Sequence, residues 1–137
     1  MVVLVLWIIE GAVGLTLFLS WLRHARGRGT RNVVTHLVMM LAGLAFWVWF
    51  VASGALLPAW TAFAIITVGI GFGDAMLLGR ARRFSPEATT LGKGYAAAIS
   101  ASFRGKLPGR VVFHAWFSAA VYFTCLGVCI GATVAAV

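Results

Sequence analysis

Charged side chains are scarce in this sequence of 137 residues: they make up 10% of the chain, and only three of them are acids. A soluble domain carries about 25% charged residues and about 45–50% hydrophobic residues, whereas 62% are hydrophobic here. A single small domain in water could not bury so much apolar surface, because a large share of its surface stays exposed. The composition therefore excludes a soluble enzyme, a disordered tail and a coiled coil.

Cysteine and catalytic motifs are also rare or missing. The two cysteines, Cys125 and Cys129, lie in an apolar run one helical turn apart, a spacing that does not suit a disulfide. We interpret both as small buried hydrophobic residues, which excludes a disulfide scaffold. The sequence has no phosphate-binding loop, no HExxH, no CxxC and no recognisable Ser–His–Asp spacing. An enzyme acting alone is therefore not expected.

Long apolar runs dominate the sequence. Four of them have the length of about 20 residues that a helix needs to cross a bilayer, and alternating strands of the β-barrel type are absent. The predicted spanning helices cover residues 2–21, 33–53, 59–79 and 111–136. The predicted fold class is therefore an all-α integral membrane protein, with one domain made of a bundle of four transmembrane helices.

The distribution of the cations predicts how the chain is oriented. All eleven Lys and Arg residues fall in the two connections 22–32 and 80–110. Positive loops stay on the cytoplasmic side, so both connections are predicted to be cytoplasmic and both termini outside the cell membrane. The richness in Arg, Ala and Gly is compatible with a bacterial source. The cations do not form one basic face on a soluble fold, so a nucleic-acid partner is not expected.

The longer connection, 80–110, predicts a short helix of its own. Ser85-Pro86-Glu87 is typical of a helix start, with a hydroxyl cap, a proline at the first position and an acid in the first turn. Apolar residues then recur at helical spacing at Leu91, Tyr95, Ala98, Ile99 and Phe103. We expect an amphipathic helix on the cytoplasmic membrane surface, in contact with anionic lipids.

Four ionisable residues lie inside the apolar runs, where such residues are costly and usually face the interior of the bundle. His36 and His114 each lie about 4.5 Å inside a predicted helix, and Asp74 lies about 7.5 Å from the end of its helix. These three side chains are predicted to share one layer near the cytoplasm. Glu10 is expected apart from them, near the bilayer midplane.

The layer has three interpretations. It is purely structural, or it holds haem b, or it binds another metal, a quinone or a proton. In the haem interpretation His36 and His114 are the axial ligands, and Asp74 orients one imidazole. The propionates are held by arginines just below this layer, namely Arg31, Arg80, Arg82 and Arg110. Glu10 is either a proton relay or a protonated carboxyl bonded to a neighbouring helix, with Thr67 and Tyr122 as candidate partners.

Three functions follow as hypotheses. The first is a small non-catalytic accessory or scaffold subunit that binds another membrane protein, or a second copy, through small-residue patterns such as Gly69-x-x-x-Gly73 and Gly127-x-x-x-Gly131. The second is a b-type electron-transfer protein with haem between His36 and His114. The third is a small proton-coupled transporter that uses Glu10 and Asp74.

Overall fold

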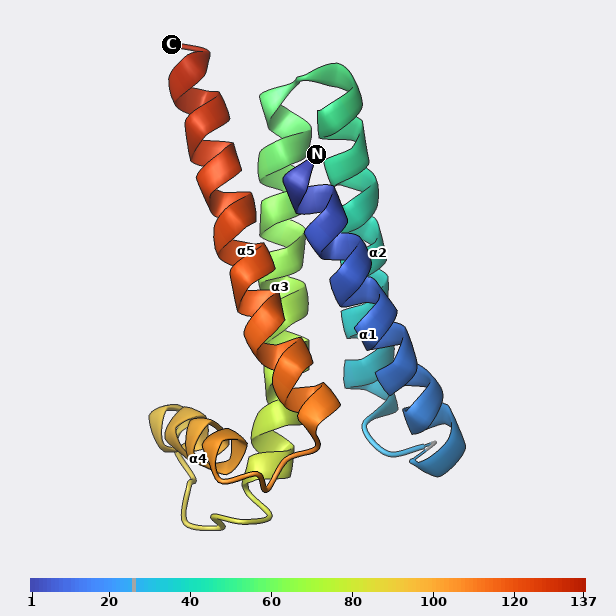
Figure 1. Cartoon of the computed structure of the whole chain (residues 1–137), viewed down its shortest axis with the longest axis vertical. Coiled ribbons are helices and arrows are strands. Elements are labelled where there is room, and N and C mark those ends of the chain that lie inside the picture. The colour runs from blue at the N-terminus through green and yellow to red at the C-terminus, as the bar shows by residue number, and fades with distance from the viewer. Residues whose placement is uncertain (26) are drawn as a thin grey trace.

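The computed structural model of the chain describes residues 1–25 and 27–137, and all regular secondary structure in them is helical. The helices, in chain order, are α1 (Val2–His24), α2 (Thr30–Ser53), α3 (Leu56–Ala81), α4 (Leu91–Phe103) and α5 (Gly109–Ala135) (Figure 1). Four of them, α1, α2, α3 and α5, are long and apolar enough to cross a membrane. The prediction of four spanning helices is confirmed to that extent, and the chain has the character of a multi-pass membrane protein.

Each long helix extends two or three residues beyond its predicted boundary on the side where the cations lie. Arg23, Arg31, Arg80 and Arg110 are all inside helices rather than in connections. Arginine is a good helix former, and its long side chain can carry the charge to water while the backbone stays helical. The predicted boundaries were too short because the end of an apolar run is not the end of the helix.

The chain turns sharply between α2 and α3, and both termini lie toward the same end of the molecule as this turn (Figure 1). Gly54 closes α2 in the left-handed conformation, with φ of 69°, and its backbone N–H donates to the Phe50 carbonyl at 2.8 Å. Only glycine adopts this conformation without steric cost, so Gly54 sets where α2 ends.

All four long helices contribute to one core. Trp47 of α2 is its largest fully buried side chain, and Trp7 of α1 packs against it at 6.1 Å between ring centroids. Small residues of α3 and α5 fill the rest of this core. They include Ala62 and Cys125, neither of which has exposed surface. The cysteines are buried and free, as the sequence predicted.

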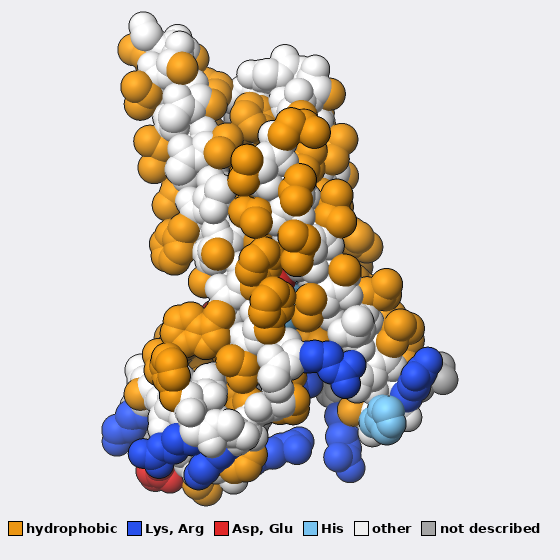
Figure 2. Space-filling view, in the orientation of Figure 1, with side chains coloured by type: hydrophobic (Ala, Val, Ile, Leu, Met, Phe, Trp, Pro, Cys, Tyr) orange, Lys and Arg blue, Asp and Glu red, His pale blue; other side chains and the backbone are white. Residues whose placement is uncertain are grey.

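The opposite end of the molecule carries the cations. Figure 2 shows Lys and Arg side chains gathered there, whereas hydrophobic side chains cover the rest of the visible face. We call this end, formed by the α1–α2 connection, the end of α3, α4 and the start of α5, the basic end.

The helix in the long connection begins later than predicted. Residues 85–88 form a turn in which the Ala88 backbone N–H donates to the Ser85 carbonyl at 3.0 Å. Proline at the second position of such a turn is as favourable as at a helix start, so Ser85-Pro86-Glu87 did not distinguish the two. The helix α4 begins at Leu91 instead, and the Thr90 hydroxyl accepts a hydrogen bond from the Lys93 backbone N–H at 3.4 Å.

The helix α4 packs on the end of α3 through its small residues. Gly94 and Ala98 are buried, and a Cβ atom at Gly94 would lie 3.4 Å from Leu78 of α3. The larger residues of the predicted apolar stripe stay uncovered, with exposed fractions of 66% for Leu91 and 80% for Phe103. Small residues face α3 because they allow the two helices to come close, and this leaves the large apolar side chains on the outer surface.

Candidate functional site

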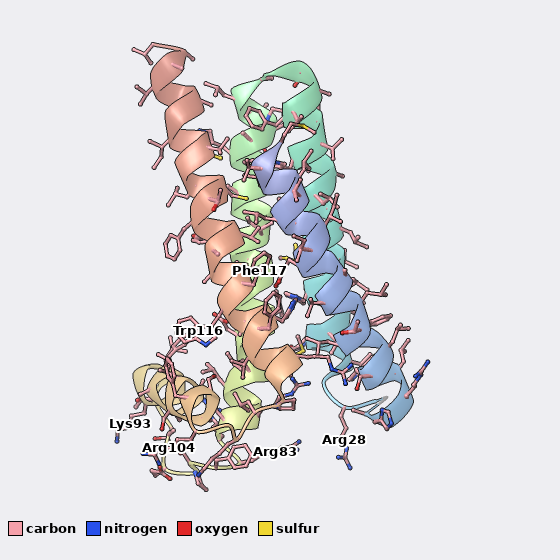
Figure 3. The ribbon with its side chains drawn as sticks, viewed as in Figure 1. Arg28, Arg83, Lys93, Arg104, Trp116 and Phe117 are labelled. Carbon is pink, nitrogen blue, oxygen red and sulfur yellow. The ribbon has the colours of Figure 1, made fainter. Side chains whose placement is uncertain are left out.

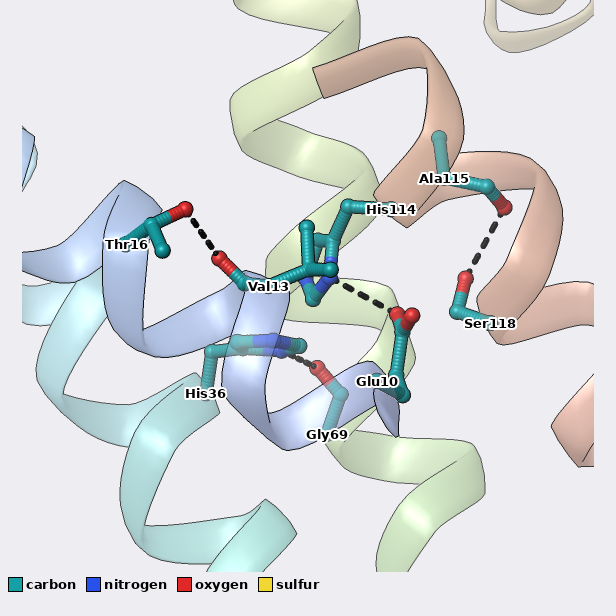
Figure 4. Close-up of polar contacts among 8 residues, drawn as sticks. All are labelled: Glu10, Val13, Thr16, His36, Gly69, His114, Ala115 and Ser118. Carbon is teal, nitrogen blue, oxygen red and sulfur yellow. Dashed lines mark hydrogen bonds and ion pairs between the residues drawn. The ribbon is translucent and has the colours of Figure 1, made fainter. Parts of the chain in front are cut away.

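The centre of the site is a buried contact between a carboxylate and an imidazole. Glu10 of α1 and His114 of α5 approach to 2.7 Å between Oε1 and Nδ1 (Figure 4). Glu10 has 8% of its surface exposed and is the one charged residue buried within the described part of the chain. The expectation that Glu10 stands apart from the imidazoles is therefore wrong.

The partners considered for Glu10 from the sequence, Thr67 and Tyr122, instead contact each other at 3.4 Å between their hydroxyl oxygens. The reason is the tilt of α1, which passes beside the first half of α5 (Figure 1). Depth along an apolar run does not reveal this tilt, so residue counting placed the carboxylate in a different layer from His114.

His36 of α2 lies against α3. Its Nδ1 donates to the Gly69 carbonyl at 2.9 Å, since a carbonyl oxygen can only accept (Figure 4). A Cβ atom at Gly73 would lie 3.1 Å from Cε1 of this ring. Because Gly69 and Gly73 have no side chains, the imidazole of His36 can pack directly against the backbone of α3. The sequence showed these two glycines as a helix-contact pattern but did not reveal that they seat His36.

The two imidazoles lie next to each other. Their ring centroids are 6.2 Å apart, and the ring planes are nearly perpendicular, at 83°. His114 also contacts α1, because a Cβ atom at Gly14 would lie 3.2 Å from its Cε1. The structure thus brings Glu10, His36 and His114 together in one cluster between α1, α2, α3 and α5. We call these three residues the imidazole–carboxylate cluster.

Some buried polar atoms of the cluster have no hydrogen-bond partner among the described residues. The Nδ1 atom of His36 donates to the Gly69 carbonyl, whereas Nδ1 of His114 lies 2.7 Å from Oε1 of Glu10 without forming an aligned hydrogen bond. Among the described residues, neither carboxylate oxygen of Glu10 accepts a hydrogen bond, although both are buried. A buried carboxylate without hydrogen-bond donors is costly.

Asp74 does not join the cluster. It accepts a hydrogen bond at 2.6 Å from the Tyr95 hydroxyl of α4. Adjacent helix positions point about 100° apart, so Asp74 faces α4 when Gly73 faces His36. This hydrogen bond raises the pKa of Tyr95 to about 12. The sequence indicated Tyr95 only as part of an apolar stripe and did not reveal that this residue ties α4 to α3.

Of the four arginines considered as propionate ligands, Arg80 and Arg110 line one cavity, whereas Arg31 and Arg82 do not line it. This cavity lies at the basic end and has a volume of about 490 Å³, with Leu17 of α1 on another of its walls. Within residues 1–25 and 27–137, no group of three or more His, Cys, Asp or Glu side chains is arranged to hold a metal ion.

Comparisons with protein-family models, with curated proteins and with solved structures found no match to this chain. The features of this chain that indicate a function are the imidazole–carboxylate cluster and the cavity at the basic end.

Proposed function

We propose that this chain is a small proton-coupled membrane carrier whose proton-binding site is the Glu10–His114 pair. The observation that carries the proposal is the 2.7 Å contact between a buried carboxylate and an imidazole on two different apolar helices. Ionisable residues inside membrane-spanning helices are costly and mark ion or proton pathways by default. At this distance one proton can be held by either group, so the pair that holds it carries no net charge, and release of the proton leaves a single negative charge on Glu10.

The orientation of the His114 ring supports a route to the pair from the basic end. Nδ1 faces Glu10, and Cε1 faces Gly14, one helical turn further along α1. Nε2 is bonded to Cε1 on the side opposite Nδ1, so it lies on the edge of the ring away from Glu10. Leu17 and Arg110, about one turn beyond Gly14 and His114, line the cavity. The imidazole thus stands between the buried carboxylate and the cavity, as a proton relay requires.

The membrane arrangement proposed with this function has four helices bundled across the cell membrane, the basic end in the cytoplasm and both termini outside. The separation of cations from apolar surface supports it (Figure 2). The helix α4 is proposed to lie on the membrane surface as an amphipathic helix, with the exposed side chains of Leu91, Ile99 and Phe103 among anionic lipids.

A second candidate, a b-type haem protein, is favoured by the way the imidazoles are held. Histidines that ligate a metal usually donate their other ring nitrogen to a carbonyl or a carboxylate. His36 and His114 have these partners at Nδ1, with ring centroids 6.2 Å apart. A metal ion bound at about 2.0–2.1 Å to both Nε2 atoms would require a ring separation of roughly this size. An optical spectrum of the purified protein decides this: a Soret band lost in His36→Ala supports haem, and a colourless preparation rejects it.

The accessory-subunit hypothesis stays a prediction, because its support is composition and helix-contact patterns rather than a contact in the structure. Purification from mild detergent tests it. A membrane protein that accompanies the chain at fixed stoichiometry would favour a subunit, and a chain that purifies alone with an intact proton site would favour a carrier.

The proton-site proposal is tested by infrared difference spectroscopy on protein in lipid nanodiscs, between about pH 4 and 9, which covers ordinary Glu and His titration. We expect a carboxyl band that disappears in Glu10→Gln and whose titration midpoint moves in His114→Gln. The matched control is Asp74→Asn, which removes the other intramembrane acid and leaves that band in place. A Glu10 band that is unaffected by His114→Gln would refute the coupling.

A further inference from the structure

The cavity at the basic end is open on one side and is formed by segments that are distant in sequence. It lies between the end of α1, the end of α3 and the connection from α4 to α5, and its volume is about 490 Å³. Figure 2 shows a hollow at this end, between the part that contains α4 and the end of α1. A cavity of this size is large enough for a phosphate group together with a glycerol-sized fragment.

The charges that line this cavity are all positive. Arg80, Arg83, Lys106 and Arg110 contribute to its walls, and none of the three acids of the chain does. Figure 3 shows Arg83 between the α4 side, which carries Lys93 and Arg104, and the end of α1. Four like charges around one space repel one another, and an anion placed among them removes that repulsion.

The remaining walls are mostly apolar, with Ser20 and His24 of α1 as their polar residues. Leu17 and Trp21 of α1 and Val111 of α5 line the cavity on the side of the membrane-spanning helices. Arginine binds phosphate through paired N–H donors, whereas leucine, tryptophan and valine offer nothing to a fully hydrated ion. A cavity lined by both cations and apolar groups matches a molecule that carries a phosphate and a hydrocarbon part.

We propose that this cavity is a specific binding site for a phosphate-bearing amphiphile, with the phosphate among Arg80, Arg83, Lys106 and Arg110 and the apolar part against Leu17. The shared chemistry is the phosphate, which an anionic lipid headgroup or a soluble phosphate ester can supply. The apolar wall favours the lipid. This inference does not depend on proton binding by Glu10 and His114.

The test compares two variants that lose the same charge. Arg83→Gln with Arg110→Gln removes two cations from the cavity, and Lys93→Gln with Arg104→Gln removes two cations of the basic end that do not line it. Each protein is extracted from vesicles of equal phosphatidylglycerol and phosphatidylcholine, and the lipids that it retains are counted by native mass spectrometry. Circular dichroism verifies that both variants fold.

We expect the wild-type chain and the control variant to retain phosphatidylglycerol in preference to phosphatidylcholine. A cation beside an anionic headgroup changes binding by about fivefold, so the cavity variant should bind phosphatidylglycerol about 25-fold more weakly. An equal loss in both variants would mean general surface attraction and would overturn the proposal. So would unchanged retention in the cavity variant.

A third arm identifies the source of the phosphate. Titration of lipid-free protein with inorganic phosphate and with glycerol 3-phosphate measures binding without an apolar part. If Leu17→Gln weakens phosphatidylglycerol retention and leaves phosphate binding unchanged, the ligand is a lipid. If inorganic phosphate displaces the lipid completely and Leu17→Gln has no effect, the phosphate site stands and its ligand is a soluble anion.

Discussion

Gly69 is the position where one added methyl group tests both the helix packing and the placement of His36. A Cβ atom there would collide with the end of the Met40 side chain and would lie 2.8 Å from Cβ of Met39. The Met40 side chain is flexible and can move aside, whereas Cβ of Met39 is fixed to the α2 backbone. Gly69→Ala therefore forces α2 and α3 apart rather than rearranging a side chain.

The size of the effect follows from these distances. Ordinary contact begins at 3.4 Å, so α2 must move by about 0.6 Å to relieve the contact with Met39. The same movement stretches the hydrogen bond from His36 to the Gly69 carbonyl, now 2.9 Å, to about the limit of useful length. Overpacking costs about 1–3 kcal/mol, and a lost hydrogen bond about 0.5–1.5 kcal/mol. We expect Gly69→Ala to lower the free energy of unfolding by about 2–3 kcal/mol.

The assay is reversible unfolding in mixtures of a mild detergent and dodecyl sulfate, followed by circular dichroism. Gly71→Ala is the matched control, because no atom lies within 4 Å of a Cβ placed there on the same helix. Its free energy of unfolding should stay within about 0.5 kcal/mol of the wild-type value. Equal stability of the two variants would refute the close α2–α3 contact and, with it, the position assigned to His36.

Two further predictions concern α4 and the cysteines. Because the hydrogen bond to Asp74 raises the pKa of Tyr95 to about 12 from the usual 10, the link between α4 and α3 should be intact below pH 10 and lost as the pH rises through 12. Phenolate absorbance in a Tyr122→Phe background follows this titration, Tyr95→Phe should abolish it, and a midpoint near 10 would contradict the bond. Cys125 and Cys129 have no exposed surface, so a maleimide should label neither in the folded protein and both after unfolding. Rapid labelling under native conditions would contradict the packing of α5.

The sequence predicted the long helices well and the site only in part. Hydropathy located all four apolar helices, and residue counting placed His36 and His114 at similar depths, in agreement with their ring contact. Residue counting failed for Glu10, because the contact of this residue with His114 depends on the tilt of α1. Asp74 was predicted to be near the imidazoles because its depth was similar, but its direction around α3 takes it to Tyr95. Depth follows from residue number, whereas rotation about the helix axis depends on the neighbouring helices.

The amino-acid sequence by itself determined that the chain forms four long apolar helices and that its cations gather in two connections and the helix ends beside them, because length and hydropathy are local properties of each segment. The tertiary structure alone decided which polar groups meet: Glu10 with His114, and Asp74 with Tyr95. These contacts depend on the tilt and rotation of whole helices. Glycines such as Gly69 and Gly73 allow those helices to pack closely, through contacts between segments far apart in the chain.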